Sequence, residues 1–154
     1  GEENKYNFPK PMWNSASCDF SFSGLKTDVS RKINALSKLK NDDINNICAS
    51  FQKTVTEVLK KKISVALDLF KREIKQDAKA FVLCGGVAAN KYIYEKIKNF
   101  CEARGIKFLT PPKELCGDNA AMIAWTGIER YKKGLIDNLN FCPQPKCELD
   151  NQTI

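Results

Sequence analysis

The sequence predicts an α/β fold that is rich in helix and contains a small sheet. Three observations support this prediction: a long amphipathic helical segment in the first half of the chain, two short apolar segments in the second half, and a helical segment after each of them. The order strand, helix, strand, helix is typical of an α/β arrangement. Two or three strands make a thin sheet, which a missing partner domain would explain. The length of 154 residues suits one domain with a loose tail.

The first forty residues predict an extended segment, a short strand and a helix. Residues 1–17 carry two prolines and several polar side chains, so they are expected to form an extended lead-in. Aromatic and polar residues alternate from Asp19 to Ser23, which predicts a short half-buried strand. Gly24 interrupts this run, and a helix is expected from Leu25 to about Leu39.

One long helix is expected after a turn at Asn41 to Asp43, whose polar side chains suit a helix N-cap. Apolar residues then recur at spacings of three and four, which predicts a single apolar stripe on that helix. The lysines lie mostly off the stripe, as expected for a solvated face. The stripe comprises Ile44, Ile47, Phe51, Val55, Val58, Leu59, Ala66, Leu67, Phe70 and Ile74.

The second half of the chain alternates strands and helices. The run from Lys79 to Cys84 is short and apolar and predicts a buried strand, which the Gly85-Gly86 pair ends. A second strand is expected from Ile106 to Leu109. The predicted helices run from Ala88 to about Arg104 and from Gly117-Asp118 to about Lys133. Residues 135–154 lose periodicity and are expected to form a tail that wraps a neighbour or is disordered.

The composition permits an RNA partner without requiring one. The net charge is +7, but only four of the 25 basic residues are arginines, and a solvated lysine-rich helix surface explains the excess equally well. No apolar run approaches the roughly 20 residues of a membrane helix. The acidic, polar N-terminus does not resemble a signal peptide. We therefore expect a soluble, cytoplasmic protein with no membrane partner.

The cysteines predict reduced thiols. There are seven of them with no Cys-x-x-Cys pair, and the chain has no histidine, which argues against a structural zinc site within this chain. Cys84 and Cys101 lie in apolar patterns and are expected to be small core residues. Nucleophilic catalysis has little support, because a serine or cysteine would lack histidine as its usual base.

Residues Phe81 to Asn90 form the first candidate site, a strand followed by paired glycines and a helix. Glycines let backbone N–H groups approach an anion, and a helix N-terminus adds the positive end of its dipole. Asn90 could then hydrogen-bond a ribose or a base. The alternative, which the pattern alone favours, is a tight turn built from small residues for packing. The dinucleotide fingerprint is excluded because its third glycine is absent.

Two further segments could carry chemistry. Asp118 opens the last predicted helix, where an aspartate is most often an N-cap and otherwise could be a carboxylate ligand to a metal. A catalytic metal requires about three protein ligands, so the others would have to lie elsewhere. The segment from Ser21 to Thr27 has hydroxyl groups and a lysine on either side of a glycine, and these side chains could bind phosphate or RNA. A connection between a strand and a helix needs the same residue types, so the pattern fits both interpretations.

Four segments together resemble one known family. They occur in the order Cys18 to Thr27, Ala49 to Gln52, Gly85 to Asn90, and Asp118 to Ala124. Each is weak alone, but four in order at such intervals are specific. The chain is similar, over about residues 18–134, to the C-terminal half of the threonylcarbamoyladenosine tRNA transferase family. That family was once called O-sialoglycoprotein endopeptidase or glycoprotease.

The resemblance implies an actin-like ATPase fold with two ribonuclease-H-like lobes, of which the first is missing here. Residues 18–134 would be the C-terminal lobe, after the lead-in of residues 1–17 and before the tail of residues 135–154. The family's metal, iron or zinc, is held by two histidines of a His-x-x-x-His helix in the first lobe and by one aspartate in the second. That aspartate matches Asp118, so we expect the fragment alone to bind no metal tightly.

The implied function is part of an enzyme that forms threonylcarbamoyladenosine. The family moves the threonylcarbamoyl group from threonylcarbamoyl-AMP to N6 of the adenosine beside the anticodon of tRNA, with AMP leaving, and the metal would orient and polarise the carbamoyl oxygen. The asparagine matching Asn90 contacts threonylcarbamoyl-AMP, and Gly85 and Gly86 lie close by. The isolated fragment is expected to be inactive.

The Phe-Ser-Phe-Ser-Gly-Leu-Lys form of residues 20–26 resembles the bacterial and organellar branch of the family. Bacterial members work with a paralogous inactive subunit and a small ATPase, so these are expected partners besides tRNA, in the cytoplasm or an organelle. The tail departs from the family's aromatic and basic ending, since it reads Pro-Lys-Cys-Glu-Leu at residues 145–149.

Two other functions are kept as alternatives. A metalloendopeptidase, the historical description, requires a metal-activated water and a general base, but the chain has no His-Glu-x-x-His motif. A non-catalytic module could bind RNA or protein through the lysine-rich helix faces. A His-x-x-x-His helix upstream in the coding sequence would favour the transferase.

Overall fold

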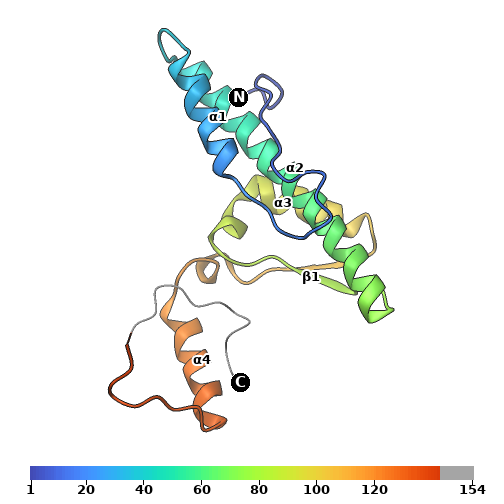
Figure 1. Ribbon diagram of the computed structural model, residues 1–154, viewed down its shortest axis with the longest axis vertical. Helices are drawn as coiled ribbons and strands as arrows, with labels where there is room; N and C mark the ends of the chain where they lie inside the picture. Colours follow the sequence, from blue (N-terminus) through green and yellow to red (C-terminus); the bar gives the residue numbers. More distant parts are fainter. Residues whose placement is uncertain (143–154) are drawn as a thin grey trace. The chain divides into compact units, whose positions relative to one another are not determined.

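The structure, a computed structural model, describes residues 1–142 and divides into two compact units, residues 1–117 and the residues from Asp118 onward. The first unit contains three α-helices, a two-stranded parallel sheet and two short 3-10 helices (Figure 1). Its elements are α1 (Ser23–Asn34), α2 (Asn41–Ile74), β1 (Ala80–Val82), η1 (Gly86–Ala89), α3 (Lys91–Glu102), β2 (Lys107–Leu109) and η2 (Lys113–Leu115). The second unit contains α4 (Ala120–Lys132). The expected helix-rich α/β fold with a small sheet is therefore confirmed.

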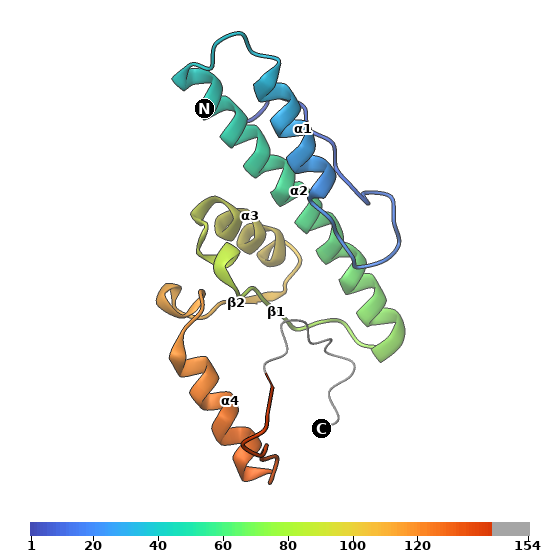
Figure 2. The same cartoon turned by 60° about the vertical axis from the view of Figure 1, so that its left-hand side comes forward.

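Helix α2 organises the first unit, as the apolar stripe predicts. The Lys40 backbone N–H donates to the Asp43 carboxylate at its start (3.1 Å), and Lys75 ends it in the left-handed conformation (φ 59°). Its N-terminal half packs against α1, and its C-terminal half packs against α3 and the sheet (Figure 2). Two clusters of buried apolar residues result. The first is centred on Phe8, Leu25 and Ile47, and the second on Ile63, Ile93, Ile97 and Cys101.

The lead-in is irregular but is tied to α2. Phe8 is buried in the first apolar cluster. Lys62 is 4% exposed, and its ammonium group donates hydrogen bonds to the carbonyls of Ser15 (3.1 Å) and Ser17 (2.9 Å). A buried lysine needs such partners, because an ammonium group without them is expensive to remove from water. The lead-in therefore contributes to the core of the first unit.

The strand predicted from Asp19 to Ser23 does not form, and α1 begins at Ser23 instead. A strand needs a neighbour for its backbone groups, and the sheet of the described residues contains only β1 and β2. Phe20 and Phe22 contact each other instead, with ring centroids 5.5 Å apart. Helix α1 also ends at Asn34, five residues before the predicted end.

The sheet is covered on one face, so its strands are less buried than expected. Strands β1 and β2 pair in parallel with Phe81 opposite Phe108, and both rings pack against the second apolar cluster. Val82 and Leu109, which point to the other face, are 58% and 39% exposed. Cys84 is also exposed, contrary to expectation, whereas Cys101 is fully buried as predicted.

The second unit follows the prediction of a final helix. Helix α4 starts after Asn119, not at Asp118, and Gly134 follows it with a positive φ of 73°. Several large apolar side chains of α4 are exposed in the described part of the chain: Met122, Ile123, Trp125, Ile128 and Tyr131. No helix among residues 1–142 is both long and apolar enough to cross a membrane. Residues 143–154, most of the predicted tail, lie outside the described residues.

Candidate functional site

The glycine pair forms a turn between β1 and η1. Gly85 has φ 88° and ψ 169°, a backbone conformation that is essentially restricted to glycine. A Cβ atom added to Gly85 or Gly86 would meet no atom within 4 Å. The tight turn that the sequence pattern favours is therefore present, but packing against neighbouring side chains does not explain the two glycines. The backbone of the turn is open to the close approach of a ligand.

The predicted continuous helix from Ala88 is interrupted at Asn90. Residues Gly86–Ala89 form the 3-10 helix η1, and α3 starts only at Lys91. Asn90 has an extended conformation (φ −72°, ψ 114°), and its side-chain Oδ1 accepts a hydrogen bond from the Ile93 N–H (3.1 Å). Asn90 is thus the N-cap of α3, which satisfies one backbone donor of the first turn.

The other end of the Asn90 side chain contacts α2. Its Nδ2 donates to the Gln52 Oε1 (3.3 Å), and both residues are partly buried. The hydroxyl of Thr56 donates in turn to the backbone carbonyl of Gln52 (2.7 Å). The fold therefore brings together two of the four motif segments, Ala49 to Gln52 and Gly85 to Asn90. Gln52 lies in one of these motif segments, but its place in the sequence predicts no role for it.

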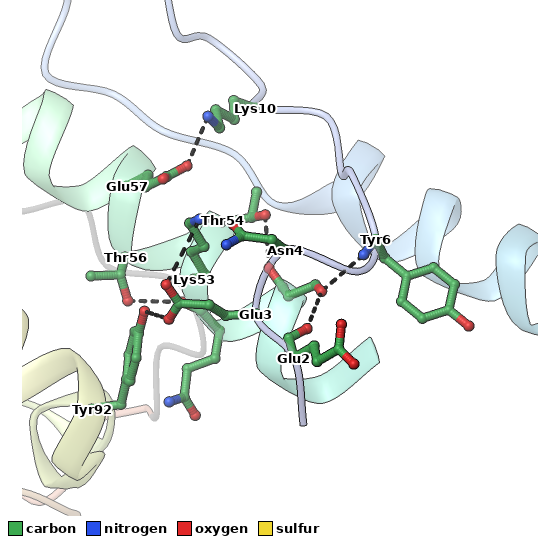
Figure 3. Close-up of polar contacts among 12 residues, drawn as sticks. Glu2, Glu3, Asn4, Tyr6, Lys10, Lys53, Thr54, Thr56, Glu57 and Tyr92 are labelled. Carbon is green, nitrogen blue, oxygen red and sulfur yellow. Dashed lines mark hydrogen bonds and ion pairs between the residues drawn. The ribbon is translucent and has the colours of Figure 1, made fainter. Parts of the chain in front are cut away.

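A polar network beside this amide pair joins the lead-in to α2 and α3. The Tyr92 hydroxyl donates to the Glu3 carboxylate (2.8 Å), and the Lys53 ammonium lies 3.8 Å from the same carboxylate (Figure 3). Lys10 and Glu57 form a second ion pair nearby (2.7 Å). Lys53 directly follows Gln52, so the network links α2 and α3 next to the Asn90–Gln52 contact. Sequence patterns gave no signal for Glu3 or Tyr92.

The electrostatics of the network follow from these contacts. Burial, with the hydrogen bond to Glu3, raises the pKa of Tyr92 to about 12. The same hydrogen bond lowers the pKa of Glu3, and Lys53 adds to this effect by its positive charge. The tyrosine therefore stays protonated and the glutamate stays ionised at neutral pH, which keeps the hydrogen bond charge-assisted.

A hollow of about 380 Å³ lies at the same end of the sheet. In open α/β sheets, ligands bind outside the carboxyl ends of the strands, which is where the glycine turn and this hollow lie. The buried Cys116 thiol donates weak hydrogen bonds to the carbonyls of Pro111 (3.7 Å) and Pro112 (3.6 Å). The lining residues are Ala88, Ala89, Lys91, Tyr94, Thr110, Pro111, Lys113 and Cys116.

Asp118 opens the second unit and is exposed. It is not the N-cap of α4, because the Asn119 Oδ1 accepts the hydrogen bond from the Met122 N–H (2.9 Å). The interpretation of Asp118 as an N-cap is therefore wrong. Its carboxylate forms no hydrogen bond or ion pair within residues 1–142, so both oxygens are available to a cation. No group of three or more His, Cys, Asp or Glu side chains that could hold a metal occurs among these residues.

In the third candidate segment, Ser21 to Thr27, the hydroxyl groups form hydrogen bonds within the segment. The Ser21 and Ser23 hydroxyls lie 3.0 Å apart at the start of α1, and the Thr27 hydroxyl donates to the Ser23 carbonyl (3.1 Å). These bonds suit the start of a helix. In the described residues, the segment from Ser21 to Thr27 thus acts as a connection into α1.

Comparison with known proteins identifies one family. Residues 1–125 match the family model described as tRNA N6-adenosine threonylcarbamoyltransferase. The protein of that name from Rickettsia bellii (strain OSU 85-389) is 45% identical over 150 residues, which cover 97% of this chain and 44% of the relative. Those from Rickettsia massiliae (45% over 152 residues) and Rickettsia canadensis (44% over 151 residues) match 98% and 97% of this chain, and again 44% of each relative. The chain thus spans less than half the length of these relatives.

Proposed function

The chain belongs to the tRNA N6-adenosine threonylcarbamoyltransferase family, and we propose that it supplies the C-terminal part of such an enzyme. The reaction would move the threonylcarbamoyl group from threonylcarbamoyl-AMP to N6 of the adenosine beside the anticodon of tRNA. The observation that carries this proposal is the open Gly85-Gly86 turn next to Asn90, the N-cap of α3, in a chain of this family. The actin-like ATPase fold, with a first lobe outside this chain, is part of the same proposal.

The glycine turn and Asn90 would bind the adenylate. The open space around Gly85 and Gly86 lets an anionic group reach the backbone N–H groups of the turn. Asn90 uses its Oδ1 for Ile93 and one Nδ2 proton for Gln52, so one amide proton remains for the ligand. These contacts would hold the nucleotide while the N6 amine attacks the carbamoyl carbon. The bond between that carbon and the phosphate oxygen then breaks, AMP leaves with the bonding electrons, and the N6 nitrogen loses one proton to solvent water.

We propose Asp118 as one ligand of a divalent metal, iron or zinc. The free carboxylate fits this role, because carboxylate oxygens bind either metal and no residue of the described chain uses them. The remaining ligands would come from a part of the enzyme outside this chain. When bound, the metal would polarise the carbamoyl oxygen and orient the group for attack. The isolated chain would accordingly be inactive and bind metal weakly.

The test is reconstitution with the full-length protein. The protein is incubated with tRNA, threonine, bicarbonate, ATP, the paralogous inactive subunit and the small ATPase, and the tRNA nucleosides are analysed by mass spectrometry. The proposal predicts threonylcarbamoyladenosine in the complete mixture and none with this chain alone. Binding of tRNA without any modified nucleoside would instead support a non-catalytic binding module, and cleavage of a protein substrate would support the peptidase.

A further inference from the structure

The amides of Asn90 and Gln52 form a chain with only one consistent orientation. A backbone N–H can donate only to an oxygen, so the hydrogen bond from Ile93 fixes the Asn90 Oδ1 toward α3. The Asn90 Nδ2 must then be the atom that contacts Gln52, and Gln52 must present its Oε1 to it. The orientation of each carboxamide is therefore determined by its hydrogen-bond partners.

We propose that Gln52 is a positioning residue for the nucleotide site: it holds the Asn90 carboxamide so that the second Nδ2 proton is presented to an acceptor on the nucleoside part of the adenylate. This inference rests on the proposed function, in which Asn90 contacts the adenylate. Within residues 1–142, the second Nδ2 proton of Asn90 has no other acceptor. Ribose hydroxyl oxygens and adenine ring nitrogens are acceptors of the required kind.

The position of Gln52 suits this role. It lies within the long helix α2, and helices hold functional groups more accurately than loops do. Its neighbour Lys53 is paired with Glu3, and Glu3 also accepts the hydrogen bond from Tyr92 in α3. The packing of α2 against α3 therefore sets the position of the Asn90 amide, although the two amide residues are 38 positions apart in sequence.

A purely structural role for Gln52 predicts different measurements. If the contact only stabilised the start of α3, its loss would lower the free energy of unfolding and leave nucleotide affinity unchanged. If Gln52 positions Asn90, its loss weakens nucleotide binding in the protein that remains folded. Gln52→Met keeps the length and the helix propensity of the side chain but removes the acceptor. Gln76→Met makes the same chemical change at an exposed residue just after α2 and is the matched control.

The experiment measures AMP binding to the full-length protein by calorimetry, with formation of threonylcarbamoyladenosine measured separately. Loss of one positioned hydrogen bond is expected to weaken AMP binding roughly three- to tenfold in Gln52→Met, with no change in Gln76→Met. In the reaction, KM for threonylcarbamoyl-AMP should rise by a similar factor while kcat changes less than about twofold. Asn90→Asp keeps the N-cap oxygen but removes the donor, so adding Gln52→Met to it should produce no further loss of affinity.

The outcomes separate the two proposals. If the wild type forms the modified nucleoside and Gln52→Met binds AMP as tightly as the wild type, the role of Gln52 is overturned and the function stands. If no modified nucleoside forms but Gln52→Met still weakens AMP binding, the function is overturned and the positioning role stands. A wild type that binds no AMP overturns the positioning role, and formation of the modified nucleoside then decides the function separately. If Gln52→Met does not fold, Gln52→Glu is measured in its place. Glutamate keeps a side-chain oxygen as the acceptor, so the AMP affinity should stay within tenfold of the wild type. Complete loss of AMP binding in Gln52→Glu would overturn the inference.

Discussion

The hydroxyl of Tyr92 donates a 2.8 Å hydrogen bond to the carboxylate of Glu3, which lies 89 residues earlier in the chain. This contact links the lead-in to α3, and the Glu3–Lys53 ion pair links it to α2. The Asn90–Gln52 amide pair lies at the same interface between α2 and the start of α3. Residues outside the family motifs thus support the contact between two of those motifs.

Removing this hydrogen bond should destabilise the chain in a pH-dependent way. Tyr92→Phe is expected to unfold at lower urea concentration than the wild type at pH 7. The folded pKa of Tyr92 is raised to about 12 from 10, so its contribution is fully present below about pH 10 and is lost as the pH rises from 10 to 12. Urea unfolding at pH 7, 9 and 11 checks this, and a difference between wild type and variant that stays constant to pH 11 would contradict it.

The stabilisation by Glu3 has the opposite pH dependence and is lost at low pH. The folded pKa of Glu3 is lowered from 4.5, so its contribution is present above pH 4.5 and is lost as the pH falls through the lower folded pKa. Glu3→Gln should therefore be less stable than the wild type at pH 7 and close to it at pH 3. Urea titrations of both proteins at the two pH values measure this difference in stability. An equal difference between the wild type and Glu3→Gln at pH 3 and pH 7 would contradict the prediction.

The two glycines of the turn should respond differently to alanine. Gly85→Ala is expected to cost about 1–3 kcal/mol, because the φ of 88° is unfavourable for any residue with a Cβ. Gly86→Ala should change the free energy of unfolding by less than about 0.5 kcal/mol, since its Cβ meets no atom within 4 Å. In the full-length protein, however, Gly86→Ala should weaken AMP binding by occupying the space that the ligand needs. Unchanged AMP affinity in Gly86→Ala would remove the turn from the proposed site.

Adjacent substitutions separate the helix cap from the metal ligand. Asn119→Ala is expected to cost about 1 kcal/mol, because the Asn119 side chain caps α4. Asp118→Ala should leave the unfolding midpoint unchanged, but in the full-length protein it should lower the bound metal and abolish activity. Elemental analysis of the purified variants gives the metal stoichiometry. Full metal content in Asp118→Ala would refute its role as a ligand.

Thiol reactivity tests the revised assignment of the cysteines. Cys101 is fully buried, and burial raises the pKa of its thiol, so it should resist alkylation in the folded chain. Cys48 and Cys84 are exposed and should react readily. Peptide mapping after brief maleimide treatment compares the three sites. Alkylation of Cys101 as fast as Cys48 would show that the core around α3 is not closed as described.

The parts of the fold with a strong local signal were predictable from sequence. Helix α2 follows from its apolar period, and the order of the strands and helices in the second half follows from short apolar runs and glycines. The strand expected from Asp19 to Ser23 was wrong, because alternating aromatic and polar residues do not supply a partner strand. The exposure of Cys84 was also missed, because an apolar run does not reveal that only one face of a sheet is covered.

The sequence motifs single out candidate site residues, but they do not predict the contacts of those residues. The motifs point to Gly85, Gly86, Asn90 and Asp118, and they leave open whether Asp118 caps α4 or binds a metal. Two potential capping side chains are adjacent there, and the hydrogen bond from the Met122 N–H shows that Asn119 is the cap. The Asn90–Gln52 contact joins positions that no local pattern relates, because it depends on how α2 packs against α3.

The proposed transferase function is tested by the incorporation of radiolabelled threonine into tRNA by the full-length protein with its partners, bicarbonate and ATP. Two transcripts are compared that differ only in whether the nucleotide beside the anticodon is adenosine or guanosine. Label is expected in the adenosine transcript alone, because only adenosine offers the N6 amine. Equal label in both transcripts, or none in either, would contradict it.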